Sequence, residues 1–414
     1  MRIAIIGTGI SGLVVAHLLH EEHDLTLFEA QTHIGGHTLT TEIDVDGKRS
    51  AVDAGFVVFN QITYPSFIKL LDRLGVQSQP TTMSFSVKCE ETGLEYSGTS
   101  LNTLFAQRRN LVRWSFLAML MDIVRFNREA RELLRQDSVA PTLRQFLAAG
   151  GYSKSFVEKY LVPMGAAIWS ASPDSMLDFP ASFFLSFLDN HGLLTVDNQF
   201  PWRVIRGGSE RYVEALSRPF RDRIRLKTPV RGIRRHPHHV ELKTAEGPTE
   251  TYDQVIVASH SDQALDLLED PCPEEREILG AIPYQPNEAV LHTDTSVLPR
   301  NRRAWASWNY QILRETGNRV VVTYNMNRLQ SLDSPETFCV SLNLTDRIDP
   351  DRILRRFHFS HPLFTPAAVN AQRRHAEISG QRRTHYCGAY WRNGFHEDGV
   401  WSGLQVGRFF GKEL

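Results

Sequence analysis

The chain opens with apolar positions that alternate between two kinds of spacing. Residues 2–6 form an isoleucine-rich run, residues 13–19 carry apolar side chains at helical spacing, and residues 25–28 form a second apolar run. Short apolar runs bounded by turn residues are typical of buried strands, whereas a repeat near 3.6 residues is typical of a helix. The pattern therefore predicts a strand, a helix and a parallel strand.

The pattern changes after these elements. Residues 42–59 predict a hairpin, because Asp46 and Gly47 near its centre accept the positive φ angles of a tight turn. Residues 64–202 carry mostly helical signals, including a long apolar and basic stretch at 101–134. We therefore expect a mainly helical insertion after the hairpin.

The chain is then predicted to return to its first sheet. Residues 203–216 predict a glycine turn and a helix, and residues 224–258 predict strands that end near Ser259 and His260. Residues 289–344 alternate apolar and polar side chains over several runs, as an antiparallel sheet does.

The order of these segments predicts an α/β protein with two discontinuous domains. The first domain comprises residues 1–63, 203–262 and 375–414, and the second comprises residues 64–202 and 263–374. A chain of 414 residues exceeds the usual size of a single domain, which agrees with this division.

Composition and charge exclude several classes of protein. Hydrophobic residues make up 42% and charged residues 22%, as in an ordinary globular enzyme. The 46 basic and 47 acidic residues almost balance, which argues against a nucleic-acid partner. Four cysteines without a CxxC pair argue against a zinc site or a disulfide scaffold and favour a reducing cytoplasm. Because the chain has no run of 18 apolar residues and no leader-like N-terminus, we expect a mature protein without a membrane span.

Three glycines directly follow the first predicted strand. Gly7, Gly9 and Gly12 have the spacing of a dinucleotide-binding loop, and Glu29 stands at the end of the next strand. Such glycines allow a tight turn, a close approach of backbone to pyrophosphate and close helix packing, while the acid accepts hydrogen bonds from a ribose. The sequence therefore predicts a nucleotide site, against the alternative of a purely structural glycine turn.

Later motifs resemble those of flavoprotein oxidases of the amine-oxidase type. Residues 35–37 (Gly-Gly-His) resemble their second glycine loop, residues 53–55 the strand beside it, residues 207–209 the return to the FAD domain, and residues 388–407 the terminal flavin motif. Arginine stands at the position of His37 in much of this superfamily, so the role of His37 is open.

The resemblance implies a two-domain α/β flavoprotein with a Rossmann-like FAD domain and a substrate domain of mixed sheet and helices. It implies non-covalent FAD bound by Gly7, Gly9, Ser11, Gly12, Glu29, Gly36, His37, Gly55, Val230, Gly388, Glu397, Asp398, Gly399 and Ser402.

Longer strings narrow the resemblance. MGAAIWSASP from Met164, VIVASHSDQAL from Val255 and GFHEDG from Gly394 resemble a bacterial family of amine-oxidase-like oxidoreductases, predicted to bind NAD or FAD. Members of this family accompany methyltransferases of the cyclopropane-fatty-acid-synthase type. The resemblance implies an FAD-dependent oxidoreductase that desaturates a methylated or otherwise modified fatty-acyl chain of a phospholipid by hydride transfer to flavin N5. It also implies a methyltransferase partner.

Two apolar stretches fit a lipid substrate. Residues 111–124 mix Trp, Phe, Leu and Met beside Arg108, Arg109 and Arg113, which is the composition of a helix at an anionic membrane surface. Residues 179–194 form an aromatic-rich run suited to an acyl tunnel. The alternative is that both stretches are core helices of the second domain. The sequence thus predicts either a purely cytoplasmic protein or one that is peripheral on the inner membrane face.

Several ionisable residues are candidates for the catalytic base. Glu397 and His396 are the first choices, because they lie in the terminal flavin motif together with Asp398. In the structural alternative, Glu397 and Asp398 are a helix cap and first-turn acids. The remaining histidine candidates in the family-like strings are His191, His260 and His292. We predict no metal site, and we interpret His236, His238 and His239 as the rim of a hairpin.

Three rival functions remain open at this point. An amine oxidase acting on a small amine or polyamine would need an aromatic cage. The candidates for such a cage are Trp305, Trp308, Tyr310, Tyr390 and Trp391. The other rivals are a flavin-bound accessory of a lipid methyltransferase without redox turnover, and a non-oxidative flavin isomerase or mutase.

Overall fold

The first layer of the fold is a parallel sheet built from both ends and the middle of the chain. The computed structural model describes residues 1–135, 141–195, 200–314 and 318–414. The strand order is β10–β2–β1–β14–β20. These strands are β1 (Arg2–Ile6), β2 (Asp24–Phe28), β10 (Ile224–Arg225), β14 (Gln254–Val257) and β20 (Thr384–Tyr386). Helix α1 (Ile10–Leu19) joins β1 to the parallel β2, which confirms the predicted strand, helix and parallel strand.

The predicted hairpin is confirmed, but its second strand is shorter than expected. Strands β3 (Thr40–Val45) and β4 (Lys48–Asp53) pair antiparallel, and Asp46 and Gly47 both have positive φ. The chain leaves this hairpin after Asp53. Strand β5 (Val58–Asn60) pairs instead with β9 (Trp202–Ile205), which also pairs with β6 (Ser78–Pro80).

The largest sheet has the order β19–β15–β18–β17–β16–β7–β8. Its strands are β7 (Phe85–Cys89), β8 (Leu94–Ser97), β15 (Tyr284–His292), β16 (Trp308–Ile312), β17 (Val322–Asn325), β18 (Cys339–Leu342) and β19 (Ile353–Pro362). The predicted antiparallel sheet over 289–344 is thus confirmed. The prediction of a mainly helical 64–202 was wrong for β6, β7 and β8. Strands β7 (FSVKC) and β8 (LEYS) alternate apolar and polar residues as strands do, but each is too short to stand out among the helical signals around it.

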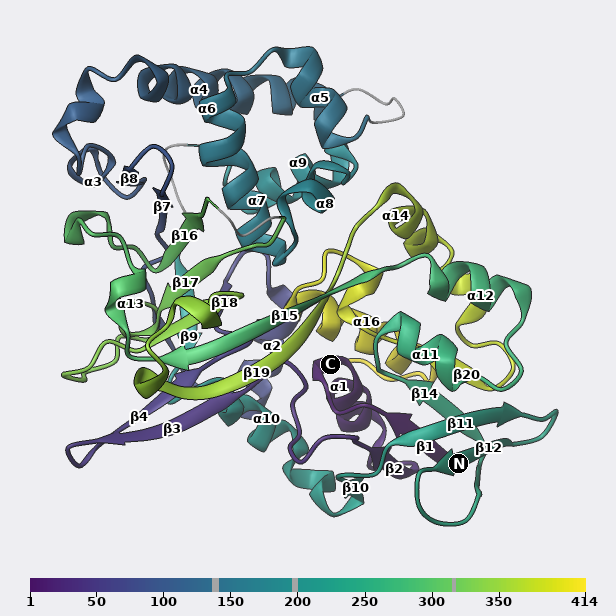
Figure 1. Cartoon of the computed structure of the whole chain (residues 1–414). Coiled ribbons are helices and arrows are strands. Elements are labelled where there is room, and N and C mark those ends of the chain that lie inside the picture. The colour runs from purple at the N-terminus through teal and green to yellow at the C-terminus, as the bar shows by residue number, and fades with distance from the viewer. Residues whose placement is uncertain (136–140, 196–199, 315–317) are drawn as a thin grey trace.

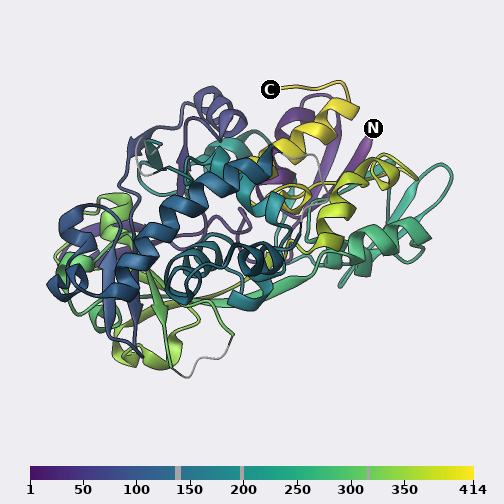
Figure 2. The ribbon, with the colours of Figure 1, turned by 90° about the horizontal axis from the view of Figure 1, so that it is seen from above.

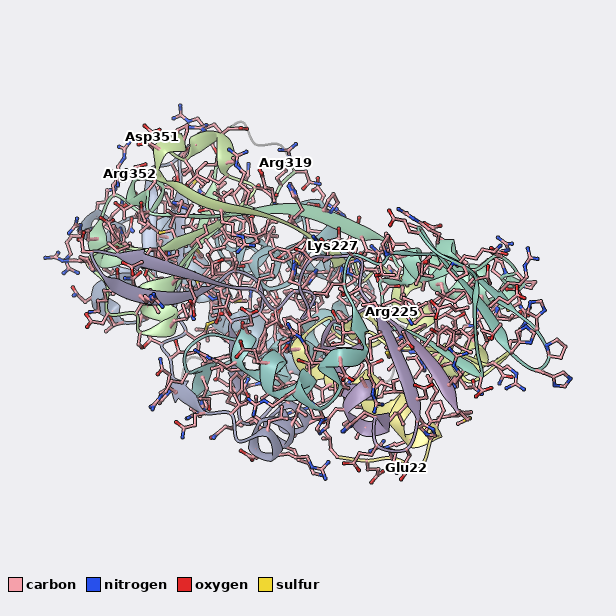
Figure 3. All side chains as sticks on the ribbon, turned by 90° about the horizontal axis from the view of Figure 1, so that it is seen from below. Glu22, Arg225, Lys227, Arg319, Asp351 and Arg352 are labelled. Carbon is pink, nitrogen blue, oxygen red and sulfur yellow. The ribbon has the colours of Figure 1, made fainter. Side chains whose placement is uncertain are left out.

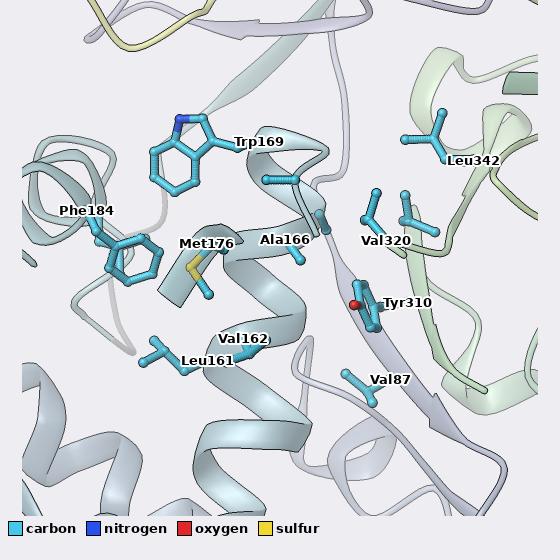
Figure 4. Close-up of a cluster of buried hydrophobic side chains, with 14 of the residues drawn as sticks. Val87, Leu161, Val162, Ala166, Trp169, Met176, Phe184, Tyr310, Val320 and Leu342 are labelled. Atoms are coloured by element: carbon cyan, nitrogen blue, oxygen red, sulfur yellow. The ribbon is translucent and has the colours of Figure 1, made fainter. Parts of the chain in front are cut away.

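A helical layer covers one end of this sheet (Figure 1). Its helices are α3 (Leu101–Leu104), η1 (Arg108–Leu111), α4 (Trp114–Leu134), α5 (Leu143–Gly150), α6 (Lys154–Phe156), η2 (Val157–Leu161), α7 (Val162–Trp169), α8 (Pro173–Leu177) and α9 (Ala181–Asn190). Figure 4 shows Trp169, Met176 and Phe184 packed among these helices, with Val87 and Tyr310 on the neighbouring strands. No helix in the described ranges is both long and apolar enough to cross a bilayer.

Most of the other α-helices and strands pack around the parallel sheet. They are α2 (Pro65–Leu74), α10 (Glu210–Ser217), β11 (Val230–Arg235), β12 (Val240–Thr244), β13 (Glu250–Tyr252), α11 (Ser261–Leu267), α12 (Pro273–Gly280), α14 (Pro366–Arg373), α15 (His375–Ile378) and α16 (His396–Phe409). Helix α13 (Met326–Gln330) instead contacts β17, β18 and β4. Side chains of α12 and α14 share one apolar cluster with β1 and β14. The domain boundaries drawn from the sequence stay a prediction.

Candidate active site

The turn after β1 has the geometry of a phosphate-binding loop. Gly7 has φ +102°, and a Cβ there would lie 2.7 Å from the carbonyl oxygen of Ala258. A Cβ on Gly12 would overlap with the carbonyl oxygen of Gly7, so Gly12 lets α1 approach the turn. A Cβ on Gly9 would meet no atom within 4 Å among the described residues. Open space therefore lies beside Gly9 at the N-terminus of α1, where the helix stabilises negative charge.

Glu29 is fixed at the end of β2, next to this turn. Its Oε2 accepts hydrogen bonds from the backbone N–H of Thr8 at 3.0 Å and from Thr8 Oγ1 at 2.6 Å. Its Oε1 accepts a hydrogen bond from the backbone N–H of Gln31 at 2.9 Å. The carboxylate therefore has a defined position from which it can accept hydrogen bonds from a ribose.

The second glycine loop packs directly on the first. Gly36 has φ +60°, and a Cβ there would lie 3.0 Å from the Cα of Gly9. A Cβ on Gly55 would overlap with the carbonyl oxygen of His37, which accepts a hydrogen bond from the backbone N–H of Phe56 at 3.0 Å. The structure thus brings together Gly9, Gly36, His37 and Gly55, as the sequence predicted for a single cofactor site.

The segment after the helical layer also returns to this site. Buried Asp53 accepts hydrogen bonds from the backbone N–H of Ser209 at 2.8 Å and from Ser209 Oγ at 2.9 Å. Val230 lies at the start of β11, where the pairing with β12 shifts its register and the ladder is locally disrupted. The backbone N–H of Thr228 donates to the carbonyl oxygen of Glu29 at 2.8 Å, which ties this strand to the nucleotide loop.

Glycines also let the last helix, α16, lie against α1. A Cβ on Gly399 would lie 2.5 Å from Ile10 Cγ2. The backbone N–H of Gly388 donates to the buried Ser402 Oγ at 3.0 Å, and Ser11 is buried in the same layer. Cys387, next to this loop, is fully buried, and burial raises the pKa of its thiol to about 12. A protonated thiol is a poor nucleophile, which agrees with the predicted non-covalent cofactor.

The three ionisable residues at the start of α16 point in different directions. His396 lines the cavity described below, stacks on Phe56 with ring centroids 3.6 Å apart, and shares a 2.5 Å hydrogen bond with the Tyr212 hydroxyl. Burial lowers the pKa of His396 to about 3, so the imidazole is neutral at pH 7. Asp398 accepts a hydrogen bond from the backbone N–H of Phe395 at 2.9 Å, as a helix-capping acid does.

Glu397 holds the N-terminus of another helix. Its Oε1 accepts from the backbone N–H of Ser66 at 3.0 Å, and its Oε2 accepts from the backbone N–H of Phe67 at 2.8 Å. Both belong to the first turn of α2, whose N–H groups have no partner within the helix. The prediction that Glu397 is the catalytic base therefore finds no support in this geometry, and the structural alternative fits better.

The cavity beside these residues has a volume of about 650 Å³. It extends from Gly55, His37 and His396 at the flavin motifs to α4 and α7 of the helical layer. Asp53 is the only acid in its described lining, which contains no lysine or arginine. Most of the remaining lining is aliphatic or aromatic.

Hydrogen bonds between two asparagine side chains hold one cavity histidine, His361, which the sequence did not reveal. Asn343 accepts from the backbone N–H of Glu288 at 3.0 Å, and its amide nitrogen donates to Asn287 Oδ1 at 2.7 Å. The amide nitrogen of Asn287 then donates to the carbonyl oxygen of Ser170 and to Nδ1 of His361, each at 2.9 Å. Since Nδ1 of His361 accepts, the proton of the neutral ring lies on Nε2.

The environment of His361 disfavours its charged form. Burial, followed by the nearby His260, lowers the pKa of His361 to about 4. Burial and the same histidine cluster hold the pKa of His37 well below its usual value. The ring centroids of His37 and His361 are 5.5 Å apart. The histidines of the cavity wall next to the flavin motifs are therefore uncharged at pH 7, whereas burial raises the pKa of Asp53 in the same wall to about 7.

The other histidine candidates divide between the cavity and the core. His191 lines the cavity, donates from Nδ1 to the carbonyl oxygen of Phe187 at 2.9 Å, and has its pKa lowered by burial to about 4. His260 stacks on Tyr284, and His292 is fully buried beside Ser341. Neither His260 nor His292 belongs to the described lining of the cavity.

Only one residue of the predicted aromatic cage lines the cavity. Trp308 does so together with Tyr324, and their rings meet edge to face at 88° with centroids 5.0 Å apart. Trp305, Tyr310, Tyr390 and Trp391 are absent from the described lining. The cage prediction therefore holds for Trp308 alone, and sequence reasoning missed Tyr324 because its strand pairing is long-range.

The hairpin histidines have a third neighbour that the sequence analysis overlooked. Glu241 lies on β12, with a carboxylate oxygen 3.4 Å from Nε2 of His236 and another 3.7 Å from Nε2 of His239. These three side chains are close enough to share a metal ion. They lie on the β11–β12 hairpin and do not line the cavity within the described chain.

Comparisons with known proteins agree with this geometry. The family model of flavin containing amine oxidoreductases matches residues 10–336. A Mycobacterium tuberculosis protein, provisionally named a flavin-containing monoamine oxidase, is 24% identical over 289 residues. The match covers 67% of this chain and spans 61% of the length of that relative.

Solved structures share the fold over nearly the whole chain. Cyclohexylamine oxidase from Brevibacterium oxydans has a TM-score of 0.69 at 15% identity. A CLA-producing fatty acid isomerase from P. acnes has a TM-score of 0.69 at 18% identity. Each comparison covers 99% of this chain and 98% of the other chain. The predicted fold of an amine-oxidase-type flavoprotein is thereby confirmed.

Proposed function

Because the chain belongs to the family of flavin containing amine oxidoreductases, we propose that it is an FAD-dependent oxidoreductase that desaturates a fatty-acyl chain. FAD is the cofactor of this family. The narrower proposal, a methylated or otherwise modified chain of a phospholipid, comes from the sequence strings around Met164, Val255 and Gly394. A methyltransferase that supplies this substrate belongs to the same proposal.

The residues of the predicted site fit FAD. Open space beside Gly9 at the N-terminus of α1 suits a pyrophosphate, and the fixed carboxylate of Glu29 suits a ribose. The first residue of α16, His396, stacks on Phe56, the neighbour of Gly55 in the chain, so the N-terminus of this helix lies beside the second glycine loop. When bound, FAD supplies an acceptor for hydride, and is reduced while the acyl chain loses a proton and gains a double bond.

The observation that carries the acyl proposal is the scarcity of charge in the part of the cavity lining that the structure describes, which holds one acid, Asp53, and no lysine or arginine. The lining histidines His191, His361 and His396 have pKa values lowered by burial to between about 3 and about 4. Asp53, the one acid in the described lining, accepts hydrogen bonds from Ser209 at Oδ1 and from the Gln330 amide at Oδ2, and burial raises its pKa to about 7, so it is a weak partner for an ammonium group. An unpaired cation is costly to bury, whereas an apolar chain gains from burial in such a site.

A neutral imidazole is the best candidate for the proton acceptor. His361 presents an N–H at Nε2, so its neutral form is a donor toward the cavity. His396 has one ring nitrogen in the hydrogen bond with Tyr212, which leaves Nδ1 without a bonded partner in the described chain. We therefore retain His396 as the proposed base and assign His361 the role of a hydrogen-bond donor.

The test is the flavin absorbance of the purified protein under anaerobic conditions, before and after adding phospholipid vesicles that carry methylated acyl chains. Bleaching of the flavin band with formation of the unsaturated chain is the expected result. Substituting His396→Gln is expected to slow bleaching by about 100-fold or more, the usual contribution of a general base. His358→Gln, at an exposed position outside the described cavity lining, is the matched control and is expected to leave the rate within about twofold of the wild type.

A second candidate function is the oxidation of an amine. Trp308 and Tyr324 form an aromatic corner of the cavity, and the indole nitrogen of Trp308 has no hydrogen-bond partner among the described residues. The names of the mycobacterial relative and of cyclohexylamine oxidase favour this candidate, whereas the fatty acid isomerase favours an acyl chain. Bleaching by a primary amine and not by vesicles would replace the acyl proposal. An unchanged spectrum with both would favour a non-redox role beside a methyltransferase.

A further inference from the structure

An exposed apolar surface lies at the edge of the helical layer. Its members are Leu101, Leu111, Val112, Trp114, Met121 and Val124, which have exposed fractions between 52% and 86%. They come from α3, the end of η1 and the first half of α4, and we call them the α3–α4 surface. Figure 1 places α3 and α4 at the edge of the molecule opposite β2 and β10, and Figure 2 shows α4 running across the molecule as seen from above. Clustering of so many exposed apolar side chains marks an interaction surface.

Helix α4 is apolar on two faces, although packing on the protein needs only one. Phe116, Met119 and Phe126 are buried against the helical layer. Trp114 and Met121 are two turns apart on the exposed face, with Val124 one turn further. An amphipathic surface helix places polar residues at such positions, so the exposed face of α4 is built to contact something apolar.

Arginines border this apolar surface. Arg108 and Arg109 are exposed and Arg113 is half-buried. Arg108 donates to Asn102 Oδ1 at 2.6 Å and Arg109 to the carbonyl oxygen of Gly93 at 2.8 Å, but none of the three arginines has a carboxylate partner within the described ranges. Asn301 donates from its amide to the carbonyl oxygen of Ala106 at 2.8 Å, which brings the exposed Arg302 of the next loop to the same edge. Apolar side chains surrounded by unpaired arginines are typical of a surface that binds anionic lipid.

The mouth of the cavity opens beside this surface. The exposed members of the described cavity lining are Gly98, Thr99, Val124 and Thr195. Gly98 and Thr99 lie just before α3, and Val124 belongs both to the cavity lining and to the α3–α4 surface. A chain that leaves a bilayer beneath this surface would therefore reach the cavity without crossing water.

We propose that the α3–α4 surface docks on the anionic face of a phospholipid bilayer and that an acyl chain enters the cavity past Val124. The identity of the entering chain rests on the proposed function, whereas the docking does not. Docking through this edge turns the parallel sheet away from the membrane. Figure 3 shows the molecule from below, with the charged side chains of Glu22, Arg225 and Lys227 near the parallel sheet. Arg225 there is already paired with Glu250 at 2.6 Å, unlike the arginines of the α3–α4 edge.

The test is co-sedimentation of the holoenzyme with vesicles of phosphatidylcholine, with or without phosphatidylglycerol. We expect binding to the vesicles that contain phosphatidylglycerol. The double substitution Arg108→Ala/Arg113→Ala is expected to weaken this binding about 30-fold, because each arginine near an anionic surface contributes roughly a factor of five. Arg319→Ala/Arg352→Ala removes the same charge from exposed positions labelled in Figure 3 and is expected to change binding less than about twofold.

The apolar contribution is tested in parallel. Trp114→Ser/Met121→Ser is expected to weaken binding by about 10-fold or more, since both side chains lose the gain from entering the bilayer. Ile62→Ser/Leu354→Ser is the matched control, because these side chains are 56% and 45% exposed outside the α3–α4 surface. The docking proposal would be overturned if Trp114→Ser/Met121→Ser and its control Ile62→Ser/Leu354→Ser lost vesicle binding to the same extent. It would also be overturned if the wild type did not bind anionic vesicles.

The outcome can be separated from that of the proposed function. Acyl substrate dispersed in detergent micelles is expected to bleach the flavin of Trp114→Ser/Met121→Ser at the wild-type rate, because neither residue lines the cavity in the described chain. Binding to vesicles without bleaching in any medium would retain the docking surface and reject desaturation. Bleaching in micelles without binding to vesicles would retain desaturation and reject the docking surface.

Discussion

Replacing Gly9 by valine is expected to remove FAD from the protein while leaving the apo chain folded. Gly9 has φ −66° and ψ 174°, which every residue type adopts, and a Cβ there meets no described atom within 4 Å. Gly9 is the N-cap of α1, so the substitution costs about 1 kcal/mol of helix capping. In a chain of this length that loss lowers the unfolding temperature by about 4 °C or less.

The cost to FAD binding is larger. The valine side chain would occupy the space beside the first N–H groups of α1, which a pyrophosphate needs for close approach. Losing two hydrogen bonds to a charged group costs about 3 kcal/mol or more, which is a loss of affinity above about 100-fold. The variant is therefore expected to purify without its yellow colour and to need far more added FAD to regain it.

Flavin absorbance per protein and the unfolding temperature of the apo chain measure the two effects separately. Gly98→Val is the matched control, because a Cβ on Gly98 also meets no described atom within 4 Å, and it is expected to retain FAD. Gly12→Val should lose both FAD and stability, because its side chain would overlap with the carbonyl oxygen of Gly7. Wild-type FAD affinity in Gly9→Val would refute the assignment of the pyrophosphate site. Unfolding of this variant to the same extent as Gly12→Val would refute the claim of open space.

Three further predictions concern titration and the helix contacts. His385 is buried against Phe409, and burial lowers its pKa from 6.5 to about 4, so it stabilises the fold fully above pH 6.5 and loses that stability as the pH falls toward 4. At pH 5 the loss in the free energy of unfolding is about 2 kcal/mol. His385→Phe should therefore reduce the fall in unfolding temperature between pH 7 and pH 5. An unchanged fall would contradict the assignment of this pH dependence to His385. Asn287→Asp should raise the pKa of His361 above about 4, because a carboxylate accepts a hydrogen bond from Nδ1 where the amide donates one. The nitrogen chemical shifts of the imidazole measure this pKa, and His191 is the unaltered reference. Glu397→Gln should lower the free energy of unfolding by about 1–2 kcal/mol through its bonds to α2, and slow flavin reduction less than about tenfold; a slower reduction at unchanged stability would restore Glu397 as the base.

The nucleotide loop could be predicted from the sequence because all of its information is local. Gly7, Gly9 and Gly12 lie within two turns of the end of β1, and Glu29 ends the very next strand. Gly7 and Gly12 have steric reasons that depend on neighbours close in sequence or on Ala258 at the end of β14, and Gly9 leaves open space beside α1. The spacing alone therefore fixes the arrangement, and the structure brings these residues together as expected.

The strands β7 and β8 could not be predicted in the same way. Their stability comes from pairing, since Phe85–Cys89 runs parallel to Trp308–Ile312, more than 200 positions further along the chain. Phe85–Cys89 and Leu94–Ser97 alternate apolar and polar side chains, but runs of five and four residues are too short to separate a strand from a single turn of helix. The partner strand decides between the two, and a single sequence does not reveal which segment that partner is.

Long-range contacts also explain why the sequence missed the amide-bound histidine. His361 stands on β19 opposite Gln285, and Asn287 lies two residues further along the paired strand β15, 74 positions before His361 in the chain. Neither residue belongs to a motif, and each alone has the appearance of an ordinary strand residue. Their common role arises from the register of β15 with β19 and from the anchoring of Asn343 by the backbone of β15.

The start of α16 shows how local geometry limits the chemistry of neighbouring residues. Successive positions on a helix point about 100° apart, so consecutive residues do not face the same partner. His396 accordingly faces the cavity, Glu397 faces the N-terminus of α2, and Asp398 caps its own helix. Three adjacent ionisable residues therefore cannot form one acid–base cluster. Of the three, only His396 belongs to the described lining of the cavity, and its imidazole is neutral at pH 7 and able to accept a proton at Nδ1, so it is the one that remains available for proton transfer.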